Sequence, residues 1–183
     1  LSEKIQWKKI YDKNPLYTQL ADKYAVREYI KEKIGEKYLI PLLYYTNKPE
    51  EIPFDKLEPP YIIKSNHGSG HIIIVRDKND INKLNIIKKC KKWIKINYYW
   101  EGREHQYRKI RPLILIEKLL LDEENLIPKD YKFHCFDGKV EFIWVCSDRF
   151  GNCKSSYFDK SWNFLPFLWS SKINGKLRFK IKR

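Results

Sequence analysis

The sequence contains no methionine, only two alanines and only seven glycines among its 183 residues. Long apolar runs are also missing, because charged residues interrupt each run well before the ~20 residues that a membrane-spanning helix needs. No signal peptide opens the chain. We therefore expect a cytoplasmic protein without a transmembrane segment. Because the chain begins with Leu1 rather than an initiator methionine, it is expected to be a fragment at one end or both.

Neither the cysteines nor the histidines show the spacing of a metal site. The four cysteines include no Cys-x-x-Cys pair, and no histidine lies at zinc-ligand spacing from them. The four histidines do not form the His-Glu-x-x-His pattern of metalloproteases. We expect free thiols and no metal ligands within this chain.

The net charge of +14 suggests an anionic partner, but the residues that supply this charge favour a different explanation. The cations are 29 lysines and eight arginines, whereas proteins that read nucleic-acid bases rely on arginine. The chain also has 23 isoleucines against four valines, which is typical of an A- and T-rich coding bias. This bias is the favoured interpretation, and a basic surface selected for an anionic partner is the alternative.

The hydrophobic content of 43% is enough for a folded core, and the patterning predicts an α+β protein. Two helices are predicted, over Asp22–Ile34 with Asp22 as N-cap and over Asn79–Ile96 with a lysine-rich face. Strands are predicted from β-branched, aromatic and turn residues at 38–44, 61–64, 71–75, 112–121, 131–136 and 139–147.

The loop after the second predicted strand has features of an anion site. Lys64 ends that strand, and Gly68 and Gly70 follow within six residues. Glycines let backbone N–H groups approach a phosphate closely. The spacing matches neither the Walker nor the Rossmann pattern, so an ordinary hairpin turn explains the loop equally well.

Glu117 ends the apolar run that starts at Pro112. A carboxylate at the end of a buried strand needs a donor, and an adenine amino group is one candidate. The pattern alone favours a glutamate that faces solvent or pairs with a lysine. Together, however, the lysine, the glycine loop and the later glutamate are the parts of a nucleotide clamp between two lobes.

In this order the motifs resemble the ATP-grasp superfamily, and within it the TupA-like family of teichuronopeptide and polysaccharide biosynthesis, often labelled glycosyltransferase. The resemblance is carried by Ala21-Asp22-Lys23-Tyr24-Ala25-Val26-Arg27, Ile63 to Gly70, Ile116-Glu117, Asp130 to Gly138 and Tyr157-Phe158-Asp159-x-x-Trp162-Asn163. It implies two small subdomains of mixed or antiparallel sheet with helices and a nucleotide cleft between them. The implied boundaries are 1–50 for an N-terminal segment, 51–120 for the first lobe and 121–183 for an incomplete second lobe.

The resemblance also implies roles in binding ATP. Lys23 and Lys64 would reach the phosphates, Glu117 the adenine amino group, and Glu124 the ribose hydroxyls. The remaining implied contacts are the loop His67, Gly68, Ser69 and Gly70, the hinge backbone of Lys118 and Leu119, and Lys132. A surface position remains the alternative for Lys23 and Lys132.

The family uses Mg²⁺ held by acidic residues near the end of the domain, but no Asp or Glu follows Asp159 here. We expect the metal ligands beyond the C-terminal end, so the chain is either truncated, which is favoured, or catalytically degenerate. The leading interpretation is an ATP-dependent, carboxylate-activating ligase of cell-envelope polysaccharide biosynthesis with an unknown carboxylate or saccharide acceptor. The alternatives are a glycosyltransferase, which lacks an Asp-x-Asp element, and a basic nucleic-acid-binding module, which is disfavoured.

Overall fold

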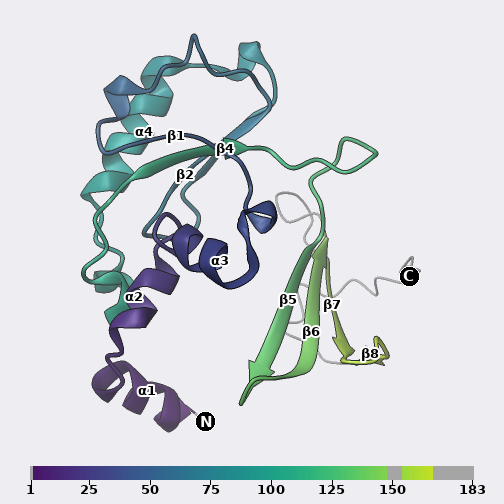
Figure 1. The fold of residues 1–183 in the computed structure, drawn as a ribbon. Coiled ribbons are helices and arrows are strands. Elements are labelled where there is room, and N and C mark those ends of the chain that lie inside the picture. The colour runs from purple at the N-terminus through teal and green to yellow at the C-terminus, as the bar shows by residue number, and fades with distance from the viewer. Residues whose placement is uncertain (1, 148–153, 167–183) are drawn as a thin grey trace. The chain divides into compact units, whose positions relative to one another are not determined.

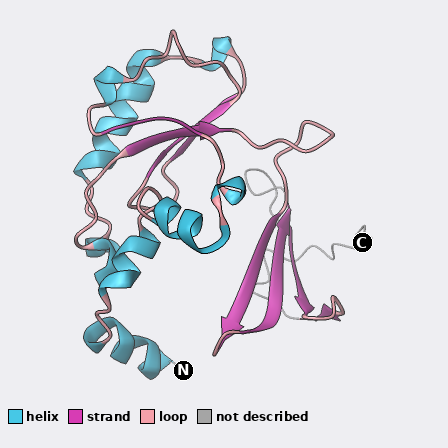
Figure 2. Cartoon of the chain, in the orientation of Figure 1, coloured by secondary structure: helices cyan, strands magenta, loops and turns pink. Residues whose placement is uncertain are grey.

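The computed structural model describes residues 2–147 and 154–166 (Figure 1). The chain divides into two compact units, residues 1–119 and 120–183, which are considered separately below. All the described helices precede Leu120, so the described part of the second unit is built from strands and loops (Figure 2). The expected α+β class with two antiparallel sheets is confirmed.

Unit 1 contains a four-stranded antiparallel sheet in the order β1-β4-β2-β3. Its strands are β1 (Leu42–Thr46), β2 (Tyr61–Ser65), β3 (Ile72–Val75) and β4 (Ile114–Lys118). Its helices are α1 (Ser2–Tyr11), α2 (Pro15–Ala21), α3 (Val26–Ile34), α4 (Lys83–Lys95) and α5 (Tyr99–Gly102). Short 3-10 turns complete it: η1 (Glu36–Tyr38), η2 (Pro49–Glu51), η3 (Lys78–Asp80) and η4 (His105–Tyr107).

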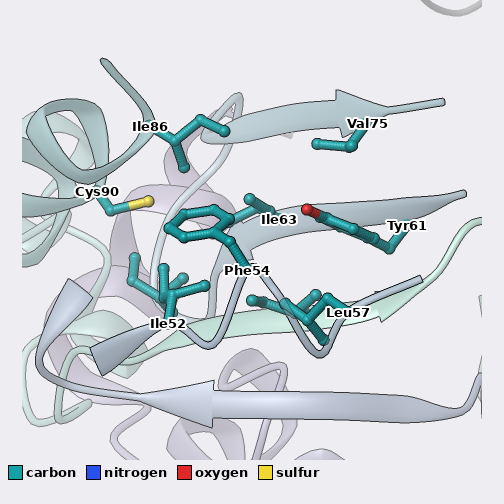
Figure 3. Packing of buried hydrophobic residues seen from close by; sticks show 10 residues of the cluster. Ile52, Phe54, Leu57, Tyr61, Ile63, Val75, Ile86 and Cys90 are labelled. Atoms are coloured by element: carbon teal, nitrogen blue, oxygen red, sulfur yellow. The ribbon is translucent and has the colours of Figure 1, made fainter. Parts of the chain in front are cut away.

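The hydrophobic core of unit 1 lies on one face of this sheet (Figure 3). Tyr61 and Ile63 of β2 pack there against Phe54 and against Ile86 and Cys90 of α4. Full burial of an aliphatic or aromatic side chain contributes about 1.5–3 kcal/mol. The core therefore fixes which face of β2 points inward, and with it the register of the neighbouring strand.

The opposite face of the sheet carries charge. Side chains alternate between the two faces of a strand, and residues paired across antiparallel strands share a face. Ile62 pairs with Glu117, and Lys64 pairs with Leu115. Lys64 and Glu117 therefore lie together on the face opposite to Tyr61, and α3 and α4 lie on opposite sides of the sheet (Figure 1).

The predicted start of the helix at Asp22 is wrong, because α3 begins at Val26. Asp22 instead ends α2, and its carboxylate accepts from the backbone N–H of Tyr24 (2.8 Å) and from Asn66 Nδ2 (2.9 Å). The predicted stop is confirmed, since Gly35 caps α3 with φ +102°. That positive φ is readily adopted only by glycine.

Three other elements also differ from the prediction, and the strand expected at 112–121 spans only Ile114–Lys118. The strand expected at 38–44 starts only at Leu42, because residues 36–38 form η1 and Pro41 has no N–H for a ladder. The helix expected from Asn79 begins at Lys83, with Asn82 as N-cap. The N-cap side chain of Asn82 accepts from the N–H of Asn85 (3.0 Å).

Unit 2 is an antiparallel sheet in the order β5-β6-β7-β8. Its strands are β5 (Asp130–Phe136), β6 (Lys139–Ser147), β7 (Lys154–Asp159) and β8 (Phe164–Leu165). The predicted hairpin around Asp137-Gly138 is confirmed, with φ +47° and +76° at the two turn residues. Two successive positive φ values are what a type I′ turn requires.

Candidate functional site

The site in unit 1 centres on the carboxylate of Glu117 at the end of β4. Its side chain is only 3% exposed. Oε2 pairs with Lys64 Nζ at 2.5 Å, and Oε1 lies 3.4 Å from Arg27 Nη1. A buried carboxylate is costly unless such partners compensate for its lost hydration. The structure thus shows Glu117 paired with a lysine, which is the alternative that the sequence pattern alone favoured over an adenine contact.

Arg27 is a site residue that the sequence reasoning did not identify. Besides its pair with Glu117, the guanidinium of Arg27 donates a hydrogen bond from Nη2 to the carbonyl of Ile40 (2.8 Å). Arg27 thereby connects α3 to the segment before β1 and to β4. A charged residue on a helix is ordinary in a sequence, so nothing local distinguishes it. Only the long-range contact reveals its position.

Lys23 lies in the turn between α2 and α3, and its ammonium is directed at the glycine-bearing loop. Nζ donates to the carbonyl of Gly68 at 2.5 Å and lies 3.5 Å from the carbonyl of Asn66. Burial, and next the nearby ammonium of Lys64, lower the pKa of Lys23. Lys23, Lys64 and Glu117 are therefore neighbours, although they come from three different segments.

Asn66 holds the start of this loop in place and was also not identified from the sequence. Its side chain is fully buried. Nδ2 donates to Asp22 Oδ1 and to the carbonyl of Arg111, each at 2.9 Å, and Oδ1 accepts from the N–H of Leu113 at 2.7 Å. These bonds connect the end of α2, the end of β2 and the start of β4.

The two histidines of the loop pack inward against α4. His67 is 2% exposed, and its ring nitrogens lie 2.9 Å from Asn66 Oδ1 and 3.0 Å from the carbonyl of Trp93. His71 stacks on the Trp93 ring at 5.2 Å, and its Nδ1 lies 2.9 Å from Ser65 Oγ. Burial is the main factor that lowers the pKa of both histidines. The imidazole of His67 is thus engaged within the protein.

The exposed part of the loop is Ser69 and Gly70. Gly70 adopts φ +76°, which explains the requirement for glycine there. At Gly68 the space is tight, because a Cβ at this position would lie 3.0 Å from His71 Nδ1. The loop therefore presents backbone at its tip, as an anion site needs, while its base is tightly packed.

The predicted hinge residues follow directly after Glu117. The N–H of Lys118 donates to the carbonyl of Pro41 (3.0 Å), and that of Leu119 donates to the carbonyl of Pro60 (3.2 Å). The side chain of Lys118 is exposed and that of Leu119 is buried. Both backbone donors are thus already used in holding the end of β4.

The remaining predicted residues, Glu124 and Lys132, belong to unit 2. Glu124 is exposed in the loop before β5, and its N–H donates to Asp122 Oδ1 at 3.0 Å. Lys132 Nζ lies 4.0 Å from the centre of the Trp144 ring on the neighbouring strand, a cation–π contact. Their roles in nucleotide binding stay predictions.

Acidic residues do not gather into a metal site in the described ranges 2–147 and 154–166, where no group of three His, Cys, Asp or Glu side chains could hold an ion. Asp159, the last acidic residue of the sequence, is used locally. Its carboxylate accepts from the N–H groups of Ser161 and Asn163 and from Asn163 Nδ2, each at 2.8 Å. The hydrogen bonds to Asn163 are the main cause of its lowered pKa.

Unit 1 thus brings a buried carboxylate and two paired cations together near the glycine loop. A model of the TupA-like ATP-grasp family matches residues 3–180, and the chain belongs to that family. Neither the curated proteins nor the solved structures include a significant match to the chain. No helix among the described residues is both long and apolar enough to cross a membrane.

Proposed function

We propose that unit 1 binds ATP on the sheet face that carries Lys64 and Glu117. On ATP binding, Lys64 leaves its ion pair with Glu117 to contact the phosphates, and the freed carboxylate oxygen accepts a hydrogen bond from the adenine amino group. The tip of the loop at Ser69 and Gly70 covers the phosphates with its backbone. The observation that carries the proposal is the buried Glu117 carboxylate between Lys64 and Arg27, because such a charge is retained at a cost in stability.

The position of Lys23 changes the role that the resemblance implies for it. Its ammonium already donates to the carbonyls of the loop. Lys23 is therefore a positioning residue that fixes the loop, and its charge acts on the phosphates at short range. Lys118, Leu119, Glu124 and Lys132 remain proposed contacts by resemblance alone.

The proposed reaction is carboxylate activation in cell-envelope polysaccharide biosynthesis of the teichuronopeptide type. The γ-phosphoryl group of ATP passes to an acceptor carboxylate, and an attacking nucleophile then releases phosphate from the acyl phosphate. Transfer of this kind depends on positioning and on neutralising the phosphate charge. Mg²⁺ supplies part of that neutralisation in the family, but the described acidic residues do not form a site for it, so no step is assigned to the metal.

Calorimetric titration with ATP tests the binding proposal. A hydrogen bond to a charged group contributes about 1.5–3 kcal/mol, so Lys64→Met should weaken ATP binding by about 10- to 100-fold. Lys78→Met is the matched control, because Lys78 is 73% exposed and pairs only with the exposed Glu58 among the described residues. Equal affinities of the wild type and a folded Lys64→Met variant would overturn the proposal.

A further inference from the structure

A cluster of aromatic rings and arginines occupies the segment between α4 and β4, and the proposed ATP site does not use it. The cluster consists of Tyr99, Trp100, Arg103 and Arg108. Arg103 lies over the rings of Trp100 (4.5 Å) and Tyr99 (5.8 Å), and Arg108 lies over Tyr99 (5.6 Å). The two rings themselves meet edge to face at 5.1 Å.

The cluster is exposed and carries positive charge. Trp100 keeps 62% of its surface accessible, and both arginines are exposed. Within the described part of the chain, neither Arg103 nor Arg108 forms an ion pair with a carboxylate. An exposed tryptophan beside two guanidinium groups offers an apolar ring face and positive charge together, which suits a ligand that has both a ring and an anionic group.

The backbone of this segment is strained where the cluster is built. Arg103 adopts φ +54°, a left-handed conformation that costs a residue other than glycine about 1 kcal/mol or more. The neighbouring glycine, Gly102, lies one position too early to relieve this strain; a glycine at position 103 would remove it. The substitution Arg103→Gly would therefore remove the guanidinium without adding backbone strain.

The cluster lies next to the glycine loop. A Cβ on Gly68 would lie 3.5 Å from Tyr98 Cδ2, so Tyr98, the residue before Tyr99, packs against the loop. Burial is the main factor that lowers the pKa of His71. The carboxylate of Glu101, in the same segment as the cluster, is close enough to raise that pKa slightly. A ligand held by the cluster would thus lie beside the proposed phosphate loop.

We propose that this cluster binds the acceptor of the reaction, and that the acceptor is a sugar that carries an anionic group. The apolar face of a pyranose ring stacks on Trp100, and Arg103 and Arg108 bind the carboxylate or phosphate, as guanidinium groups do in a bidentate manner. The role as an acceptor site rests on the proposed ATP-dependent function. A nucleic acid also combines rings with anions, but the cluster offers only one highly exposed ring, which is too few for a row of stacked bases.

Saturation-transfer NMR with glucuronate and glucose 6-phosphate tests the proposal, with glucose as the neutral probe. At least one of the two anionic sugars should bind the wild-type chain more tightly than glucose. Which of them binds more tightly shows whether the anionic group of the ligand is a carboxylate or a phosphate. Arg103→Gly removes the guanidinium while relieving the backbone strain, so it should fold and bind the sugar at least fivefold more weakly. Arg108→Gln should act similarly, and Arg76→Gln, at an exposed arginine after β3, is the control.

The outcomes separate this inference from the ATP proposal. ATP affinity should be unchanged in Arg103→Gly, because the cluster is not part of the nucleotide site. ATP binding without any sugar binding, or sugar binding that survives both cluster substitutions, overturns the inference alone. Sugar binding that depends on the cluster in a chain that does not bind ATP supports the binding site and overturns the ATP proposal. A labelled oligothymidylate that binds through Arg103 and Arg108 while the sugars do not overturns the inference in favour of nucleic acid.

Discussion

Lys64 of β2 and Glu117 of β4 form an ion pair on the face of the sheet opposite to the hydrophobic core. The alternation of side chains puts Tyr61 and Ile63 of the same strand into that core. The strand order therefore does two things at once, because the register that buries the apolar residues also brings the two charges together. A shift of one residue in β4 would move Glu117 to the core face.

We predict that Glu117→Ala lowers the free energy of unfolding by about 3 kcal/mol, since it leaves Lys64 and Arg27 without their shared partner. The double variant Lys64→Met, Glu117→Leu should cost less than the sum of its single substitutions. Guanidinium denaturation measures both effects. The exposed pair of Lys83 and Asp55 is the control, because Lys83→Met should cost less than about 1 kcal/mol. Additive effects at Lys64 and Glu117 would contradict the account.

A second prediction concerns the tie between Lys23 and the loop. Lys23→Met removes the donor to the carbonyls of Asn66 and Gly68, so the loop should open more often. We expect amide hydrogen exchange in residues 67–71 to rise about tenfold, which corresponds to about 1.4 kcal/mol. The exposed Lys13→Met variant should leave exchange in the loop unchanged. If exchange in Lys23→Met equals that of the wild type, Lys23 does not position the loop.

Acid should destabilise unit 1 through His67 and His71. Burial lowers the pKa of both side chains in the folded state, so between pH 6.5 and their lowered pKa values the unfolded chain binds more protons. Stability is therefore fully present above pH 6.5 and is lost as the pH falls. The melting temperature should drop between pH 7 and pH 5, and His71→Asn should reduce that drop. His105→Asn, in η4, is the control, and an unchanged slope in His71→Asn would contradict the interpretation.

The hydroxyl of Tyr61 offers a test of the core. Tyr61 is fully buried in the cluster of Figure 3, and its hydroxyl has no hydrogen-bond partner in the described part of the chain. An unsatisfied buried hydroxyl is destabilising. Tyr61→Phe should therefore raise the free energy of unfolding by about 1 kcal/mol and the melting temperature by about 2–4 °C. A lower melting temperature for Tyr61→Phe would show that the hydroxyl has a stabilising partner.

Local chemistry made much of the fold predictable. The Asp137-Gly138 turn and the strands of the two hairpins follow from turn residues and β-branched runs, which act within a few positions. The start of α3 was not predictable, because the carboxylate of Asp22 accepts from Asn66, 44 residues away, and does not cap α3. A long-range hydrogen bond decided between two local roles of the same side chain.

The candidate site shows the same division. Lys64 and Glu117 were recognisable because each ends an apolar strand, which is a local pattern. Arg27 and Asn66 were not, since their importance comes from contacts with β4 and the segment before it. Likewise, the inward packing of His67 depends on Trp93 of α4, which the loop sequence does not reveal.

Calorimetric titrations that compare ATP with ITP show whether Glu117 recognises the adenine base. Inosine has a carbonyl oxygen where adenosine has the amino group, so the wild type should bind ATP at least tenfold more tightly than ITP. In Glu117→Gln the side-chain amide can donate to that oxygen, and the preference for ATP should largely disappear. Equal binding of ATP and ITP by the wild type, or an undiminished preference in a folded Glu117→Gln variant, would contradict the account.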